Sequence, residues 1–135
     1  MAYYLIAFFT LGPAFMTFKA VQLWRNAELV GFFMNTFAFL PFGKDVRRGE
    51  VRSLNLTVAS LWAADVLLLV GLTGGELSGF RAGAVVAAVL VILACVCGEV
   101  CVVLFNAPKF VVPPHMRTDP GVLAARRARR HSARR

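Results

Sequence analysis

Histidine is scarce in this sequence, and the common catalytic motifs are missing. Both histidines, His115 and His131, lie outside the long apolar runs. The chain by itself therefore offers no bis-histidine haem site within a membrane and no histidine-based metal centre. There is also no Walker loop, Gly-x-Ser-x-Gly elbow, Cys-x-x-Cys pair or His-Glu-x-x-His motif. We predict that the protein is not an enzyme and uses no cofactor or metal.

Cysteine and acidic residues are also few. The three cysteines, Cys95, Cys97 and Cys101, lie in one apolar run, and at that spacing on a helix none can bridge another. We interpret them as small packing residues. Seven acidic residues stand against fifteen basic ones, and eight of the basic residues lie from Lys109 onward. The positive charge is therefore concentrated in a C-terminal tail.

Apolar residues dominate what remains. The chain is 59% hydrophobic with a mean hydropathy of +0.68, which predicts an all-α integral membrane protein. Three runs, at about residues 3–24, 54–73 and 82–105, are long enough as helices to cross the roughly 30 Å core of a bilayer. The last two are joined by a short Gly-rich turn and should form an antiparallel hairpin. Residues 1–105 are thus predicted to form one membrane domain.

A further apolar segment, residues 29–42, is fourteen residues long and reaches roughly 21 Å as a helix. That is short for a span, so we predict an interfacial or re-entrant segment. The alternative is a fourth transmembrane helix in a four-helix bundle. The segment contains five phenylalanines, which suggests a groove for lipid or quinone as one hypothesis and a simple packing face as the other.

Each hairpin helix carries one acidic residue, Asp65 in the first and Glu99 in the second. An ionised carboxylate in a bilayer costs about 2.5 to 3.5 kcal/mol on insertion scales, so both should face a partner, a wet cavity or the bundle interior. They are offset by roughly two helical turns and should not share a proton. Two interpretations stay open: a hydrogen bond between helices, or a proton or cation site.

Small residues recur at helical spacing on the hairpin. Helices in lipid associate where small side chains let backbones approach closely. We expect helix packing at two rows, one of Gly79, Gly83 and Ala87 and the other of Ala59 and Ala63.

Basic residues decide the expected topology. The positive-inside rule places the basic loop at residues 44–52 and the tail at residues 106–135 on the cytoplasmic or matrix side. We expect the tail to begin as an extended strap and to contact anionic lipid, without sequence-specific binding of nucleic acid. The residues expected to contact headgroups or a partner are Lys19, Trp24, Arg25, Lys44, Arg47, Arg48, Arg126, Arg127, Arg129 and Arg130.

Three functional hypotheses follow. The first is a non-catalytic accessory or assembly subunit of a larger, energy-transducing membrane complex of the respiratory type. The second is a small homo-oligomeric transporter or channel coupled to protons or cations, with Asp65 as the ion site. The third is a lipid- or quinone-binding membrane protein. Arginine outnumbers lysine twelve to three, which is typical of a high-GC genome, and the expected location is a bacterial plasma membrane or the mitochondrial inner membrane.

Overall fold

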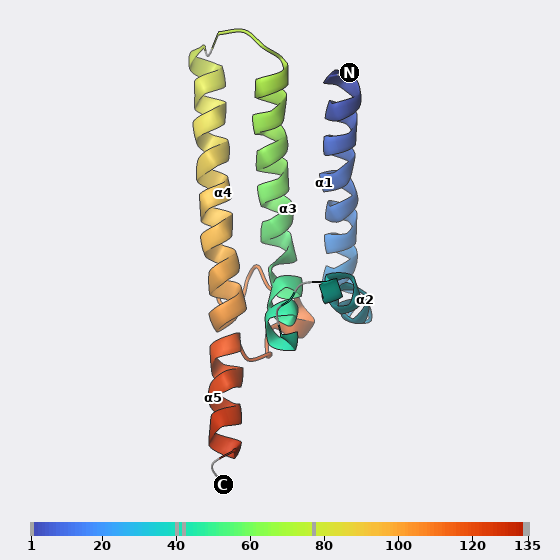
Figure 1. The fold of residues 1–135 in the computed structure, drawn as a ribbon, viewed down its shortest axis with the longest axis vertical. Coiled ribbons are helices and arrows are strands. Elements are labelled where there is room, and N and C mark those ends of the chain that lie inside the picture. Colours follow the sequence, from blue (N-terminus) through green and yellow to red (C-terminus); the bar gives the residue numbers. More distant parts are fainter. Residues whose placement is uncertain (1, 40, 42, 77, 134–135) are drawn as a thin grey trace.

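Three long helices form the body of the protein. The computed structural model describes residues 2–39, 41, 43–76 and 78–133, and all regular elements within these ranges are helices (Figure 1). The long ones are α1 (Ala2–Arg25), α3 (Lys44–Leu72) and α4 (Gly79–Phe105). In the described ranges these three are long and apolar enough to cross a membrane. The prediction of an all-α protein with three such helices is confirmed.

The segment after α1 is short. Helix α2 (Leu29–Thr36) runs into the 3-10 helix η1 (Phe37–Phe39), and together they reach roughly 17 Å, about half of a hydrocarbon core. Figure 1 places α2 at the end of α1 remote from the N-terminus. The Phe33 side chain is buried. Residues 40 and 42 of the predicted segment lie outside the described ranges, so its C-terminal end is not placed.

Helix α3 begins earlier than the sequence predicted. The predicted loop at residues 44–52 is wrong, because Lys44 is already the first residue of α3. Lysine, arginine and glutamate are good helix formers, so the charged stretch continues the helix without a break. Gly49 and the four consecutive residues 51–54 are buried, so the chain covers this part of the helix on all sides. Hydropathy alone detects the apolar part of such a helix and misses its charged beginning.

Helices α3 and α4 run antiparallel, and their backbones are close together at Gly49. A Cβ atom on Gly49 would lie 2.9 Å from Cγ1 of Val103 and 3.0 Å from its Cα atom. Further along, the end of the Leu56 side chain packs on Gly98. At the far end the turn is closed by Arg81, which donates a hydrogen bond to the Val70 carbonyl at 2.6 Å. The hairpin is therefore held along its whole length.

The buried core lies toward the end of the hairpin opposite this turn. It joins α1, α2, α3 and α4 with the segment that follows α4. Its members are Ala20, Leu23, Phe33, Val51, Leu54, Val58, Val102, Val112 and Met116.

The segment after α4 folds back under the helices. Asn106 ends α4 in the left-handed conformation, with φ of 56°, and its side-chain amide donates to the carbonyls of Met116, Arg117 and Asp119 at 3.4, 3.2 and 2.6 Å. The short 3-10 helix η2 (Pro114–Met116) and the buried side chain of Val112 follow. The prediction of an extended strap is therefore wrong. The Val112 and Met116 side chains enter the core, whereas Phe110 is 75% exposed.

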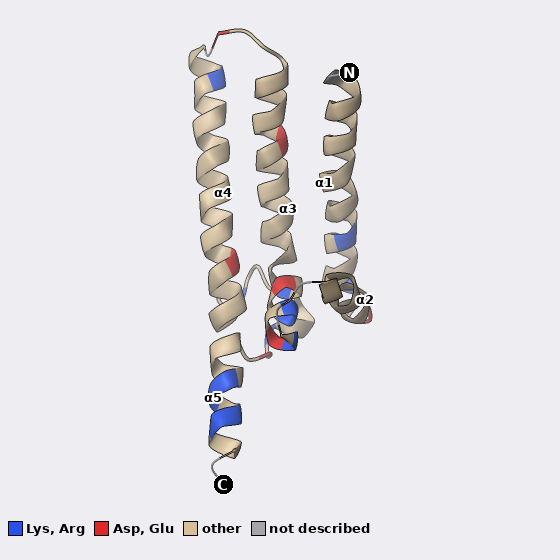
Figure 2. Ribbon diagram, in the orientation of Figure 1, with Lys and Arg blue, Asp and Glu red and all other residues tan. Residues whose placement is uncertain are grey.

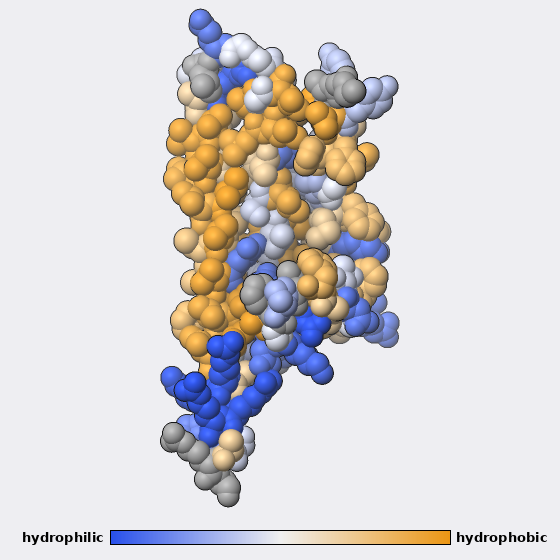
Figure 3. Space-filling model, in the orientation of Figure 1, coloured by the Kyte–Doolittle hydropathy of each residue, from blue (hydrophilic) through white to orange (hydrophobic). Residues whose placement is uncertain are grey.

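Charged residues gather at this same end. Figure 2 shows most lysines, arginines and acids near α2, the start of α3 and helix α5 (Val122–Ser132), while the helices above them are nearly free of charge. In the space-filling view the α4 side is a continuous apolar surface that gives way to basic side chains around α5 (Figure 3). The two ends of the molecule therefore differ. The body formed by α1, α3 and α4 is apolar, and the opposite end, here called the base, is basic and is formed by α2, the start of α3 and α5.

The close contact at Gly49 predicts an asymmetric response to alanine. We expect Gly49→Ala to lower the free energy of unfolding by about 1 to 3 kcal/mol, because the new methyl group overpacks the helix contact. Gly71→Ala, in the same helix but with open space around its Cβ position, should be neutral or stabilising, since alanine favours helix by about 1 kcal/mol. Unfolding of the detergent-solubilised protein by SDS titration measures both. Equal effects of the two substitutions would contradict the close approach.

Candidate functional site: a buried carboxyl beside an apolar groove

Asp65 lies in the last third of α3, and only 5% of its surface is exposed. The Thr10 hydroxyl of α1 reaches its two carboxyl oxygens at 3.2 and 3.4 Å. In the described part of the chain, the two ion pairs are Arg48–Asp119 and Arg129–Asp45, and neither involves Asp65. The carboxyl therefore sits among apolar helices with one hydroxyl partner and no compensating cation.

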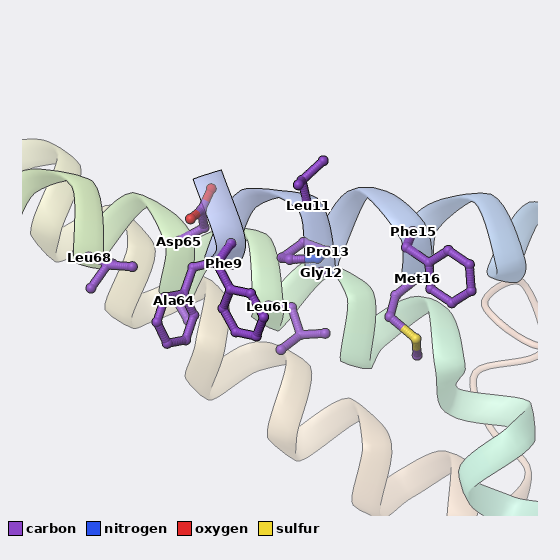
Figure 4. A pocket seen from close by; sticks show the side chains of 11 residues that line it. Phe9, Leu11, Gly12, Pro13, Phe15, Met16, Leu61, Ala64, Asp65 and Leu68 are labelled. Carbon is purple, nitrogen blue, oxygen red and sulfur yellow. The ribbon is translucent and has the colours of Figure 1, made fainter. Parts of the chain in front are cut away.

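Beside Asp65 there is an apolar groove between α1 and α3, with a volume of about 780 Å³. Figure 4 shows Asp65 and Phe9 close together toward one end and Phe15 and Met16 at the other. The side chains that line it are large and apolar apart from Asp65 and a few small residues. They are Phe8, Phe9, Leu11, Gly12, Pro13, Phe15, Met16, Leu61, Ala64, Asp65 and Leu68.

Polar contacts bracket this groove. Thr10 meets Asp65 toward the N-terminal end of α1, and Trp62 of α3 donates from its indole nitrogen to the Thr17 hydroxyl at 2.9 Å, two turns further along α1. The Thr17 hydroxyl in turn lies 2.7 Å from the Pro13 carbonyl within α1. Helices α1 and α3 are thus linked at both ends of the groove, which keeps its walls in a fixed relation.

Glu99 occupies a separate place on α4. The Thr57 hydroxyl of α3 donates to its Oε1 atom at 2.7 Å. Glu99 also lines a second cavity, of about 220 Å³, together with Glu50 of α3. Asp65 is two turns further along α3 than Thr57, so the two predicted acids are each held by a threonine of a neighbouring helix and are not brought together.

Sequence reasoning did not find Glu50 beside Glu99. The sequence predicts a loop at residues 44–52, and a residue in a loop cannot be assigned to a helix face. Continuing the helix back from residue 54 would have given the signal, because Glu50 is seven residues before Thr57 and therefore on the same face. Two carboxyl groups consequently line one small cavity near the basic end of the bundle.

The two predicted packing rows differ in the structure. Ala63 is buried and Ala59 is half-buried. Gly79, Gly83 and Ala87 are exposed, and a Cβ atom on either of these two glycines would meet nothing within 4 Å. A helix packed against this second row would have to come from another molecule, so that part of the prediction stays a prediction.

The predicted headgroup residues near the base also divide into groups. Arg48 is paired with Asp119 at 2.6 Å, and Arg129 is paired with Asp45 at 2.9 Å, so both tie parts of this chain together. The ammonium group of Lys19 lies over the ring of Phe32, 5.4 Å from its centroid.

The other predicted headgroup residues make no ion pair in the described ranges. Arg25, Lys44, Arg126, Arg127 and Arg130 are exposed, whereas Trp24 and Arg47 are half-buried.

Arg52 was not among the predicted site residues, yet it is almost fully buried at 1% exposure. Its guanidinium donates to the Pro120 carbonyl at 2.9 Å. The three cysteines are free, with Cys95 buried and the other two exposed. Within the described ranges no group of three or more histidine, cysteine or acidic side chains is placed to hold a metal ion.

Chemically, Asp65 has hydrogen-bonding capacity that Thr10 does not use. A carboxylate has about four acceptor positions, and a protonated carboxyl has one donor besides its acceptors. One threonine hydroxyl engages only one or two of these positions. The remaining capacity lies beside the apolar groove.

The comparisons with known proteins add no family. No family model, no curated protein and no solved structure matches the chain.

The two threonine contacts predict unequal coupling energies. Hydrogen bonds between membrane helices average about 0.6 kcal/mol and reach about 1.7 kcal/mol in double-mutant cycles. We expect the Thr57–Glu99 pair, at 2.7 Å, to lie near the upper value and the longer Thr10–Asp65 pair near the average. Cycles built from Thr57→Val with Glu99→Gln, and Thr10→Val with Asp65→Asn, measured by SDS unfolding, test this. A larger coupling for Thr10 with Asp65 would contradict the order.

Proposed function

We propose that this protein is a non-catalytic accessory or assembly subunit of a larger membrane complex, in which the basic helix α5 binds an acidic surface of a neighbouring subunit. The observation that carries the proposal is the fixed direction of α5. A free basic tail would adapt to any anionic surface, whereas this one is held by specific contacts on both sides of its start.

Those contacts begin before α5. Asn106, Arg48 and Arg52 all bind residues 116–120, which lead into the helix. Gly121 then lies so close to the Leu104 carbonyl of α4 that a side chain at this position would collide with it. Within α5 itself, Arg129 is paired with Asp45 of α3. The base of the molecule therefore sets the position of α5 at two points.

This position carries the arginines away from the membrane. In Figure 1, α5 continues the direction of α4 beyond its end. Its eleven residues reach about 16 Å. The headgroup layer on each side of a bilayer is only roughly 5 to 8 Å thick. With α4 crossing the bilayer, the exposed Arg126, Arg127 and Arg130 project toward or past the outer edge of the headgroups, where a protein surface is the better partner.

Other basic residues are placed for lipid. Lys19, Arg25 and Lys44 lie near the ends of α1 and α3 at the basic base, at the level where snorkelling side chains meet anionic headgroups. The positive-inside rule then puts this base, with the C-terminus, on the cytoplasmic or matrix side. We propose a bacterial plasma membrane or the mitochondrial inner membrane as the location, as the sequence suggested.

The transporter hypothesis has less support. Its path would have to connect Asp65 with Glu99, but these carboxyls lie beside separate cavities and are held by different threonines. The larger cavity is a groove between two helices and not a passage along the bundle axis. A path would need further copies of the chain, for which the exposed row at Gly79 and Gly83 is the available contact face.

The fixed direction of α5 is itself testable through Asn106. Asn106→Gly keeps the left-handed backbone, because glycine adopts positive φ without strain, but removes the amide that binds three carbonyls. We expect backbone amides of residues 112–122 to exchange hydrogen at least tenfold faster, since each lost bond is worth about 1 kcal/mol or more. Hydrogen exchange read by mass spectrometry measures this. Unchanged exchange would mean that the amide does not hold the segment.

The proposed function is tested by what purifies with the protein. We expect gentle detergent extraction of the tagged protein from its native membrane, followed by native mass spectrometry, to give a stoichiometric complex with unrelated subunits. Replacing Arg126, Arg127 and Arg130 by glutamine should remove or weaken at least one of them. A pure homo-oligomer or a lone monomer would contradict the accessory function.

A matched control separates charge from position. Replacing Lys19, Arg25 and Lys109 by glutamine removes the same three charges from other parts of the chain. We expect this variant to keep the complex intact, even where it binds anionic lipid less well. If both variants lose the same subunit to the same degree, total charge rather than α5 is responsible.

A further inference from the structure

The groove between α1 and α3 has the properties of a small-molecule site. Its volume of about 780 Å³ falls within the roughly 300 to 1,000 Å³ of typical ligand pockets, which are mostly apolar with a few convergent polar groups. Here the polar group is the Asp65 carboxyl, 95% buried, which the Thr10 hydroxyl binds from outside the groove lining. Lipid surrounds this part of the molecule, so an occupant would arrive from the membrane.

A helix of another protein is a poor occupant. Close packing of membrane helices needs small residues at the contact. The groove is instead walled by large side chains, among them Phe8, Phe9, Phe15, Leu61 and Leu68, which hold another backbone away. The small positions Gly12 and Ala64 lie between these walls and are open to a slender or flat molecule.

A plain hydrocarbon chain is also incomplete as an occupant. It would fill the apolar volume but add no hydrogen bond to Asp65, whose two carboxyl oxygens share the single proton of the Thr10 hydroxyl. A head group with a carbonyl or hydroxyl oxygen adds such a bond, and a hydrogen bond is worth about 0.5 to 1.5 kcal/mol. A hydroxyl donates to the carboxylate, and a carbonyl accepts from the protonated carboxyl.

We propose that the groove binds a small membrane-soluble amphiphile whose flat ring carries carbonyl or hydroxyl oxygens, the chemistry of a quinone. The flat ring lies between phenylalanine side chains of α1 and the α3 wall, where its faces and edges contact apolar side chains. One ring oxygen bonds to Asp65, and Thr10 orients the carboxyl from the other side. The apolar tail follows the groove toward Met16. This site is independent of the proposed role of α5.

The test is photoaffinity labelling of the full-length protein in phosphatidylcholine nanodiscs. The probe is a benzoquinone with a decyl chain and an azido group, and the cross-linked peptides are located by mass spectrometry. We expect saturable cross-links within residues 8–16 or 61–68, which an excess of unmodified decyl-benzoquinone suppresses. Absence of saturable cross-links there would overturn the proposal.

Two glycine substitutions give a matched pair of variants. A Cβ atom at Gly12 or at Gly83 would meet nothing within 4 Å, so a side chain can leave the backbone at both positions without a clash at its first atom. Gly12 lines the groove, whereas Gly83 lies on an exposed face of α4. Gly12→Leu should abolish the saturable cross-links, and Gly83→Leu should leave them unchanged. Equal labelling of the two variants would show that the probe does not occupy the groove.

The polar contact is tested at Asp65. Asp65→Leu should weaken the apparent affinity about tenfold, the effect of losing one hydrogen bond to a buried group. Asp65→Asn keeps a donor and an acceptor and should retain binding. If Asp65→Leu binds the probe as well as the unmodified protein does, the ring oxygen is not recognised and the proposal fails.

Competitors identify the occupant. Decane, which has a chain but no head, should not compete with the photoprobe at concentrations where decyl-benzoquinone does. Dioctanoylglycerol, which has a hydroxyl but no ring, should compete weakly. Equal competition by decane would show that an ordinary hydrocarbon chain fills the groove. Stronger competition by dioctanoylglycerol than by the benzoquinone would assign the site to a glycerolipid. Either result overturns the ring assignment.

Discussion

The left-handed residue at the end of α4 is the constraint on which the base of the protein depends. Asn106 reverses the chain, and its side-chain amide then binds three carbonyls of the segment that it has turned back. This reversal lets Val112 and Met116 enter the core beneath the hairpin. It also brings Asp119 to Arg48 and the Pro120 carbonyl to Arg52. Without this reversal α5 would have no defined direction, and its arginines would have no fixed positions.

Polar side chains inside the apolar body follow a single rule, which is that each acid is met by a threonine of the next helix. The bilayer core contains no water to hydrogen-bond a carboxyl, so a hydroxyl of the neighbouring helix takes its place. Thr57 satisfies Glu99 at short distance, and Glu99 lies near the charged base. Thr10 does less for Asp65, which lies farther from that base and beside a groove. The difference between these two acids is what makes Asp65 the candidate for a ligand.

The sequence predicts the three long helices because a run of about twenty apolar residues is best accommodated as a helix that crosses a membrane. It misses the first turns of α3, because charged residues such as Arg47 and Arg48 lower the hydropathy of this stretch. The contact of Gly49 with Val103 of α4, which packs these turns, is not visible in the sequence. The sequence names both intramembrane acids but neither threonine, since a contact between α1 and α3 has no local signal in the chain. The groove and the folding of residues 106–121 are equally non-local. Both depend on contacts between residues far apart in the chain, 55 positions for Thr10 and Asp65 and 71 positions for Arg48 and Asp119.

The groove and the base are related through the way in which α1 is attached. Helix α1 joins the core through Ala20 and Leu23 near its C-terminal end, while toward the N-terminus Thr10 and Thr17 supply its polar links to α3. Phe8, Phe9 and Phe15 line the groove between the two helices. A molecule in the groove would make apolar contacts with α1 and α3 where these two helices do not contact each other. Its binding would then stabilise the pairing of α1 with α3 without moving α5, which is held by α3, α4 and the segment between α4 and α5.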